Sequence, residues 1–273
     1  MIRLAVRVAR ADADAVLAEL LDLAPGGLEE REVGEDAIEY VLYGAPGELP
    51  TLPDVRAAAG EAVVDVSTSE IPDDWSERWK AFHRPVDVSW RFRRLRVRPP
   101  WEPPLDGDGI DLVIDPGQAF GTGGHHTTRL CLELLLELEP AGALADWGCG
   151  TGVLAIAAAR LGFDPVLACD SDPAAVAATR ENAAVNGVLR IAVSRVDLRR
   201  EEGPWAPVVL ANLVRPLLLE IAALMTRPPQ TLIVSGLLRA ETADVASAFA
   251  RHGLRETARR DGGEWSALRL QQT

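Results

Sequence analysis

Asp146-Trp147-Gly148-Cys149-Gly150-Thr151-Gly152 lies between a stretch that predicts a strand, Ala143–Asp146, and a stretch that predicts a helix, Val153–Leu161. Glycines at a strand-to-helix turn let the backbone come close to a ligand, and the N-terminus of a helix favours negative charge. We therefore expect Gly148, Gly150 and Gly152 to lie against a cofactor. About 20 residues beyond the glycines, Asp170 ends the next predicted strand, where a carboxylate can hold both hydroxyls of a ribose.

The same spacing also fits a dinucleotide site, because Gly150-x-Gly152-x-x-Ala155 loosely matches the dinucleotide pattern. Spacing alone therefore leaves a dehydrogenase open. Asp146 favours a methyltransferase, since a carboxylate facing the crevice would repel a pyrophosphate and attract the ammonium of a methionine group. A predicted C-terminal hairpin, Leu254–Arg259 with Trp265–Leu270, also suits a methyltransferase sheet. Asn212, at the end of the fourth predicted core strand, either faces this site or caps the following helix, and the local pattern favours neither.

Alternating strands and helices over residues 109–273 predict an α/β domain with a mostly parallel sheet closed by that antiparallel hairpin. Residues 1–70 predict a small α+β domain in the ferredoxin-like order β-α-β-β-α-β. RNA-binding domains share this order but stack bases on aromatic side chains of the sheet, and only Tyr40 and Tyr43 are aromatic here. We therefore interpret residues 1–70 as a domain that recognises a protein substrate.

Residues 71–108 predict a connector that contains a short helix and a hairpin. Arginines alternate with apolar residues over Val86–Val97, which indicates the solvent-exposed face of a hairpin more than a nucleic-acid patch.

Charge is distributed unevenly along the 273 residues, whose net charge is −13. Residues 1–71 hold five basic and fifteen acidic side chains, a net −10, whereas residues 72–101 are net +4. An acidic domain repels nucleic acid and attracts basic partners, so we expect a basic protein substrate and no direct nucleic-acid contact. An acidic surface that only keeps the protein soluble explains the charge equally well.

No stretch approaches the ~20 apolar residues that cross a bilayer, and the first ten residues lack the apolar core of a signal peptide. Three widely spaced cysteines, Cys131, Cys149 and Cys169, do not resemble a disulfide framework. We therefore expect a cytoplasmic protein without a membrane partner.

A second glycine-rich segment, Asp115–Thr128, runs into a predicted helix and can close over a cofactor. It contains His125 and His126, which could help to accept a proton in the reaction. Adjacent histidines rarely bind one metal ion together, and no neighbouring residues complete a ligand set. The sequence therefore predicts no metal site.

The chain resembles the bacterial methyltransferase family that modifies ribosomal protein L-eleven of the large subunit. The similarity covers nearly the whole chain, although residues 1–70 match in layout only. It rests on Asp115–Thr128, the tryptophan-rich stretch Asp74–Lys80, Arg98-Pro99-Pro100-Trp101, Asp146–Gly152 and Asn212-Leu213. The family's usual loop reads Gly-Thr-Gly-Thr-His-Pro-Thr-Thr, and here Gly124 and His126 replace its Thr and Pro. Trp147 stands where a small or aliphatic residue, or Phe, is more usual.

The resemblance implies that residues 109–273 form a class I methyltransferase (Rossmann-like) domain behind a substrate-recognition domain. It implies S-adenosylmethionine as the cofactor, with Thr128, Gly148, Asp170 and Asn212 lining the cofactor and reaction site. It also implies methyl transfer to lysine side chains and an N-terminal amine of ribosomal protein L-eleven, and Asn212 would orient the amine. Because the loop departs from the family's pattern, another protein lysine or a small amine stays an alternative substrate. A cofactor-binding protein that assists ribosome assembly without catalysis is the alternative from another class.

Overall fold

The computed structural model describes residues 2–13, 16, 20, 28–34, 36–44, 49–50, 55, 60–70, 84–115 and 126–273. The chain divides into two units, Met1–Ala81 and Phe82–Thr273. None of the described helices is both long enough and apolar enough to span a bilayer.

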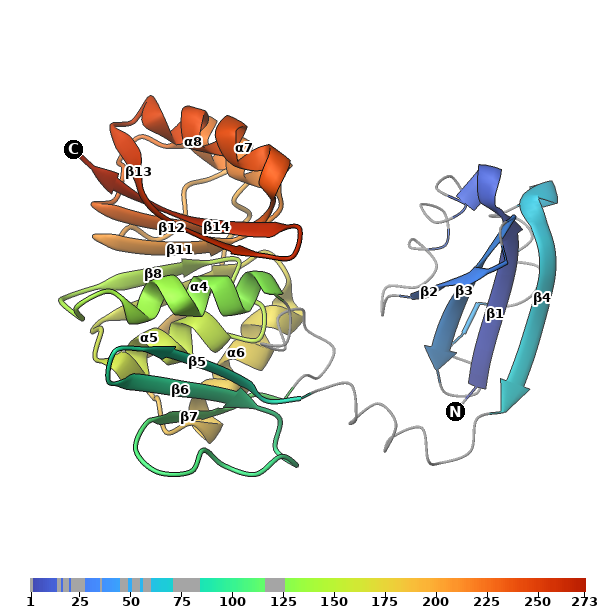
Figure 1. Ribbon diagram of the computed structural model, residues 1–273, viewed down its shortest axis with the longest axis horizontal. Helices are drawn as coiled ribbons and strands as arrows, with labels where there is room; N and C mark the ends of the chain where they lie inside the picture. The colour runs from blue at the N-terminus through green and yellow to red at the C-terminus, as the bar shows by residue number, and fades with distance from the viewer. Residues whose placement is uncertain are drawn as a thin grey trace. The chain divides into compact units, whose positions relative to one another are not determined.

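Seven strands of the second unit form one sheet in the order β10-β9-β8-β11-β12-β14-β13 (Figure 1). They are β8 (Leu144–Trp147), β9 (Val166–Asp170), β10 (Ile191–Arg195), β11 (Val208–Asn212), β12 (Thr231–Leu238), β13 (Leu254–Gly262) and β14 (Trp265–Gln272). β8 to β12 pair in parallel, whereas β14 runs antiparallel between β12 and β13. The C-terminal hairpin forms as predicted. Because the strand order reverses between β8 and β11, a crevice is expected at their carboxyl ends.

Helices cover both faces of this sheet (Figure 1). On one face lie α4 (His126–Leu136), α5 (Val153–Leu161) and α6 (Pro173–Val185), and on the other lie α7 (Arg215–Leu224) and α8 (Thr242–Ala250). α7 begins two residues before the predicted start at Leu217 because Pro216 occupies its first turn, where a missing N–H costs nothing.

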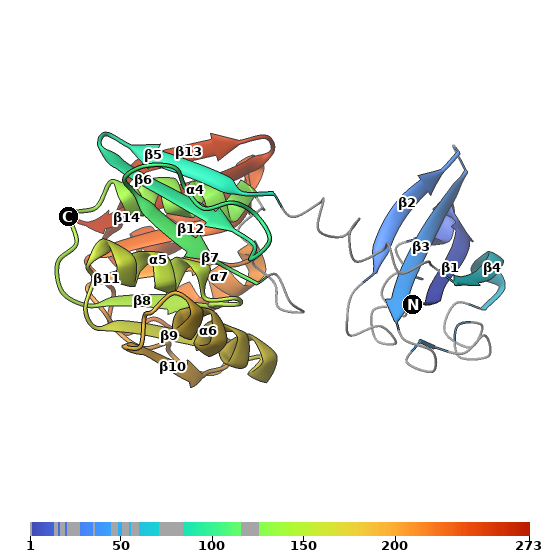
Figure 2. The same cartoon turned by 90° about the horizontal axis from the view of Figure 1, so that it is seen from below.

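A three-stranded sheet packs on the outer side of α4 and α5 (Figure 1, Figure 2). It contains β5 (Val86–Trp90), β6 (Arg93–Arg98) and β7 (Ile110–Val113) in that order, with β6 and β7 parallel. Val88, Leu95, Val97 and Leu112 point into one core together with the leucines of α4. The hairpin of β5 and β6, which the sequence places in the connector, therefore shares a sheet with β7 through the pairing of β6 with β7.

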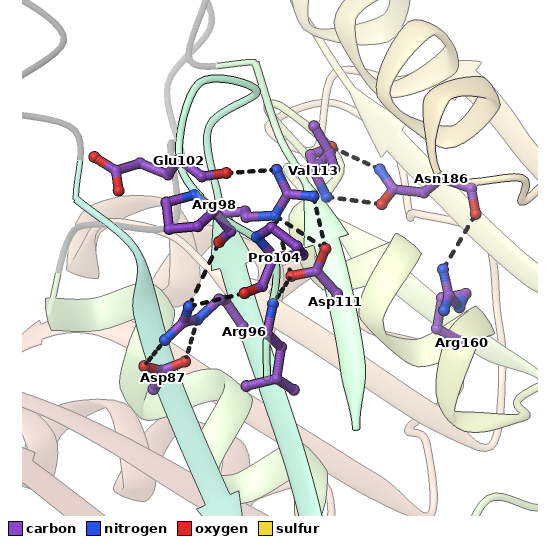
Figure 3. Close-up of polar contacts among 11 residues, drawn as sticks. Asp87, Arg96, Arg98, Glu102, Pro104, Asp111, Val113, Arg160 and Asn186 are labelled. Atoms are coloured by element: carbon purple, nitrogen blue, oxygen red, sulfur yellow. Dashed lines mark hydrogen bonds and ion pairs between the residues drawn. The ribbon is translucent and has the colours of Figure 1, made fainter. Parts of the chain in front are cut away.

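Three of the four arginines of β6, Arg93, Arg96 and Arg98, form ion pairs inside this unit, the last two of them shown in Figure 3. Arg96 makes a two-pronged contact with Asp87 at 2.8 and 2.7 Å, and Arg98 contacts Asp111 at 2.8 Å. Arg98 also donates to the carbonyl of Glu102 at 2.8 Å. Because these charges are matched within the sheet, the structure favours the hairpin-face interpretation over a nucleic-acid patch.

The first unit contains a four-stranded antiparallel sheet in the order β2-β3-β1-β4. Its strands are β1 (Ile2–Ala9), β2 (Glu29–Val33), β3 (Ala37–Gly44) and β4 (Val63–Glu70). Alternate residues of β1 and β3 bury one face in a core that also holds Ala13, Val16, Leu20 and Val55. The predicted helices at 13–23 and 52–59 are described only at those single residues, so the ferredoxin-like arrangement stays a prediction.

Candidate active site

The glycine loop between β8 and α5 has a backbone that only glycine adopts easily. Gly148, Gly150 and Gly152 have φ values of 75°, 53° and 82°. A Cβ on Gly148 would also lie 2.3 Å from Cδ2 of Leu213, and one on Gly152 would lie 2.7 Å from the Thr179 methyl carbon. These close approaches explain why the loop between a buried strand and a buried helix contains three glycines.

A cleft lies at the carboxyl ends of β8, β9, β10 and β11, with about 740 Å³ of space between protein atoms, part of it open to solvent. Five residues that the sequence assigns to the site line it together: Thr128, Gly148, Gly150, Asp170 and Asn212. Gly152 does not line the cleft but precedes the first residue of α5, where its left-handed backbone starts the helix. The predicted crevice at the reversal of strand order therefore exists.

The carboxylate of Asp170 is fixed by backbone donors on both sides. Its Oδ2 accepts from the N–H of Gly150 at 3.0 Å, and its Oδ1 accepts from the N–H of Asp172 at 3.0 Å. Asp172 in turn caps α6 by accepting from the N–H of Ala174 at 2.8 Å. The carboxylate at the end of β9 is therefore held in one orientation at the cleft wall, with lone pairs left to accept from hydroxyls.

Asp146 lies beneath the glycine loop rather than at the cleft surface. Its side chain is 1% exposed, it is not among the cleft-lining residues, and its Oδ2 accepts from the N–H of Ala155 at 3.0 Å. Its Oδ1 is buried without a hydrogen-bond partner among the described residues. Burial raises the pKa of Asp146 to about 7, although the Ala155 N–H opposes this and the Asp170 charge adds to it. The expectation that Asp146 faces the crevice thus differs from its position in the structure.

Asn212 ends β11 and contacts the first turn of α4. Its Nδ2 donates to Oγ1 of Thr128 at 3.3 Å. The adjacent carbonyl of Thr127 accepts from Oγ of the buried Ser235 at 3.0 Å, which fixes this turn to β12. The capping alternative for Asn212 is wrong: Val214 precedes α7 at the cap position, and no side chain caps that helix.

The two histidines do not join the site within the described part of the chain. His126 is the exposed first residue of α4, does not line the cleft, and lies near Gly262 of the β13–β14 hairpin. His125 and the segment 116–125 lie outside the described residues.

Sequence reasoning missed one wall of the cleft, formed by the turn after β10. Asp197, Leu198 and Arg199 line the cleft there, beside Ser171, Val196 and the apolar Leu213 and Leu217. Val196 is anchored because its N–H donates to the Asp170 carbonyl at 3.0 Å. Asp170 is identified from the sequence as an acidic residue at the end of a predicted core strand, and Asp197, which lies two residues beyond the end of β10, is a similar signal.

Two features define a class I methyltransferase fold. The strand order of the parallel sheet reverses between β8 and β11, and the antiparallel β14 lies between β12 and β13. A solved structure of ribosomal protein L11 methylase from Lactobacillus delbrueckii subsp. bulgaricus matches it with a TM-score of 0.57 and 29% identity, over 66% of this chain and 95% of that chain. The family model for ribosomal protein L11 methyltransferase (PrmA) matches residues 54–273. The chain belongs to this family, and the resemblance found in the sequence is confirmed.

Curated relatives extend the match to most of the chain. Ribosomal protein L11 methyltransferase of Myxococcus xanthus is 36% identical over 283 residues, covering 89% of this chain and 96% of the relative. The protein of the same name from Geobacter sulfurreducens is 40% identical over 244 residues, covering 88% of this chain and 74% of the relative. By fold and by family the chain is a methyltransferase.

Proposed function

We propose that this protein transfers methyl groups from S-adenosylmethionine to lysine side chains, the N-terminal amine, or both, of ribosomal protein L11. The observation that carries the proposal is the contact between Asn212 and Thr128 at the cleft that Asp170 and the glycine loop also line. The names of the relatives support the substrate. The dehydrogenase alternative loses its support, because the family match and the β14 insertion belong to methyltransferases.

The cleft offers groups that fit the cofactor. Asp170 presents a fixed carboxylate for the two ribose hydroxyls. Val196 and Leu198 offer an apolar wall for a purine ring, and Asp197 offers an acceptor for its amino group. Gly148 and Gly150 line the cleft where the methionine part would lie, and Asp146 lies beneath them without reaching the cleft surface. When bound, the cofactor supplies a sulfonium methyl group that an amine can attack.

Asn212 is the residue that we assign to orient the amine. Its Nδ2 is engaged with Thr128, so its Oδ1 is the atom left to accept an N–H from the incoming amine. A lysine amine has a reference pKa of ~10.4, so a neutral amine at pH 7 costs ~4–5 kcal/mol. The positive charge at the sulfonium site disfavours a neighbouring ammonium and reduces this cost. The remaining contribution is orientation, and a strong general base is not required.

The first unit is proposed to recognise the protein substrate as a ferredoxin-like domain. Its net charge of −10 over residues 1–71 complements a basic ribosomal protein. We also propose that the enzyme works in the cytoplasm, where its substrate is made and where its three buried, unpaired cysteines stay reduced.

Single-turnover transfer of a tritiated methyl group to purified ribosomal protein L11 tests the proposal. Asn212→Ala should lower the rate roughly 10²-fold, a typical loss for a misplaced reactant, while the Kd for S-adenosylhomocysteine changes little. Thr128→Val, which keeps Asn212 but removes its anchor, should lower the rate less. An unchanged rate in Asn212→Ala would remove Asn212 from the reaction, and label entering a different protein of a lysate would overturn the substrate.

A further inference from the structure

Three polar side chains lie in a line along α6 and its C-terminal cap: Thr179, Asn182 and the cap residue Asn186. Thr179 is fully buried and Asn182 is 4% exposed. Asparagine is unfavourable inside helices because its amide competes with the backbone for hydrogen bonds, and a buried amide is costly unless its groups are paired. A buried asparagine within α6 therefore needs a compensating set of contacts.

Asn182 makes those contacts with two segments that are distant in sequence. Its Nδ2 donates to the carbonyl of Thr151 in the glycine loop at 2.9 Å. Its Oδ1 accepts from the N–H of Asp115, two residues beyond β7, at 3.1 Å. One amide thus joins the glycine loop to the start of the second glycine-rich segment.

The polar neighbours of Asn182 hold the glycine loop and β7 separately. One turn earlier, Oγ1 of Thr179 donates to the carbonyl of Gly150 at 2.9 Å, so it also holds the glycine loop. One turn later, the side chain of Asn186 holds β7 (Figure 3) and also donates to the backbone carbonyl of Asn182 at 2.7 Å, without contacting the glycine loop. Its Oδ1 accepts from the N–H of Val113 at 2.8 Å, and its Nδ2 donates to the carbonyl of the same residue at 2.7 Å.

We propose that Asn182 is a positioning residue for cofactor binding, which fixes the backbone of Thr151 against that of Asp115. The inference rests on the proposed function, since it assumes that the glycine loop binds the cofactor. Gly150, the neighbour of Thr151, lines the cleft and donates to Asp170, so a shift of Thr151 displaces both the loop and the ribose carboxylate. Asn182 itself does not line the cleft.

This role predicts an effect on binding rather than on chemistry. The loop contacts the cofactor equally in the ground state and in the transition state, so its displacement weakens uniform binding and leaves kcat nearly unchanged. In the full chain, Asn182→Ala should raise the Kd for S-adenosylhomocysteine, measured by titration calorimetry, about tenfold, the effect of losing roughly one net hydrogen bond to a binding loop. The KM for S-adenosylmethionine should rise in parallel, while kcat stays within about threefold.

Asn186→Ala is the matched control, because it removes an amide on the same helix that holds β7 without touching the glycine loop. It should lower stability and keep the parent Kd. Thr179→Val keeps the shape of the buried side chain and removes the hydroxyl that contacts Gly150 and Cys149 of the glycine loop, so it should raise the Kd even if Asn182→Ala folds poorly.

Two results would overturn the inference: a parent-like Kd in both Asn182→Ala and Thr179→Val, or an equal rise in Kd in Asn186→Ala. A parent enzyme that binds S-adenosylhomocysteine but methylates no ribosomal protein would overturn the proposed substrate and leave this inference standing. A parent that binds no S-adenosylhomocysteine would overturn both.

Discussion

Replacing Asp146 with asparagine should stabilise the free protein at pH 8 and change it little below about pH 4. The carboxyl group is 1% exposed, and one of its oxygens has no partner among the described residues. Asparagine has nearly the same shape and can still accept from the N–H of Ala155 through Oδ1. The substitution therefore removes the titration of a buried acid and keeps most of its packing.

The sign follows from the two pKa values. In the folded protein burial raises the pKa of Asp146 to about 7, whereas an aspartate in an unfolded chain has a pKa of about 3.9. Between these values the folded state holds a proton that the unfolded state has released, so the contribution of Asp146 to stability falls as the pH rises from about 4 to about 7. Above that window the buried carboxylate is charged, and its cost is on the order of 2–4 kcal/mol.

Urea unfolding of the parent and of Asp146→Asn at several pH values between 4 and 8, without cofactor, measures this directly. The difference between the two proteins cancels the titration of every other group. We expect the free energy of unfolding of Asp146→Asn to exceed that of the parent at pH 8 and the excess to shrink towards pH 4. A pH-independent difference, or a variant that is less stable at pH 8, would refute the account, because it would mean that the carboxylate titrates normally or has a favourable charged partner.

Two further substitutions test the loop and its supports. Gly148→Ala should lose about 1–3 kcal/mol of stability and weaken cofactor binding, because its Cβ would meet Leu213 at 2.3 Å at the cleft wall; Gly253→Ala, with φ 80° but nothing within 4 Å, isolates the backbone strain and should keep the parent Kd for S-adenosylhomocysteine. Trp147→Phe should lose about 2–3 kcal/mol in a denaturant melt, because the 3.0 Å bond from Nε1 to the Pro204 carbonyl disappears and the smaller ring leaves a cavity in the core, and an unchanged stability would contradict this packing.

The parts of the site that the sequence predicts are those fixed by topology. The carboxyl ends of parallel strands meet at one edge, so the residues that end β8, β9 and β11 had to converge, and Gly148, Asp170 and Asn212 do so. The local sequence pattern does not predict a side chain's role where contacts with residues distant in the sequence determine it. The sequence pattern fits a helix cap at Asn212 equally well, and the choice is resolved by its contact with Thr128, 84 residues away, and by Val214 at the cap position of α7.

The position of Asp146 could not be predicted from the sequence, for a different reason. All four residues of β8 are buried, because helices cover both faces of the sheet. Alternation along such a strand tells which side chains share a face, but it does not tell which face leads to the cleft. The backbone N–H of Ala155, at the start of α5, donates a hydrogen bond to one oxygen of Asp146 and keeps the carboxyl group beneath the loop.

Trp147 shows how the chain accommodates its departure from the family pattern. Its ring packs in the core on the α7 and α8 side of the sheet and is not among the residues that line the cleft. A Cβ on Gly203 would lie 2.5 Å from its Nε1, so a glycine is required there, and the Pro204 carbonyl accepts from the indole. The large side chain is thus accommodated by contacts with Gly203 and Pro204 rather than by residues that line the cleft.

The exposed His126 likewise lies off the cleft. At Trp147 and His126 the departure from the family pattern therefore leaves the residues that line the cleft unchanged.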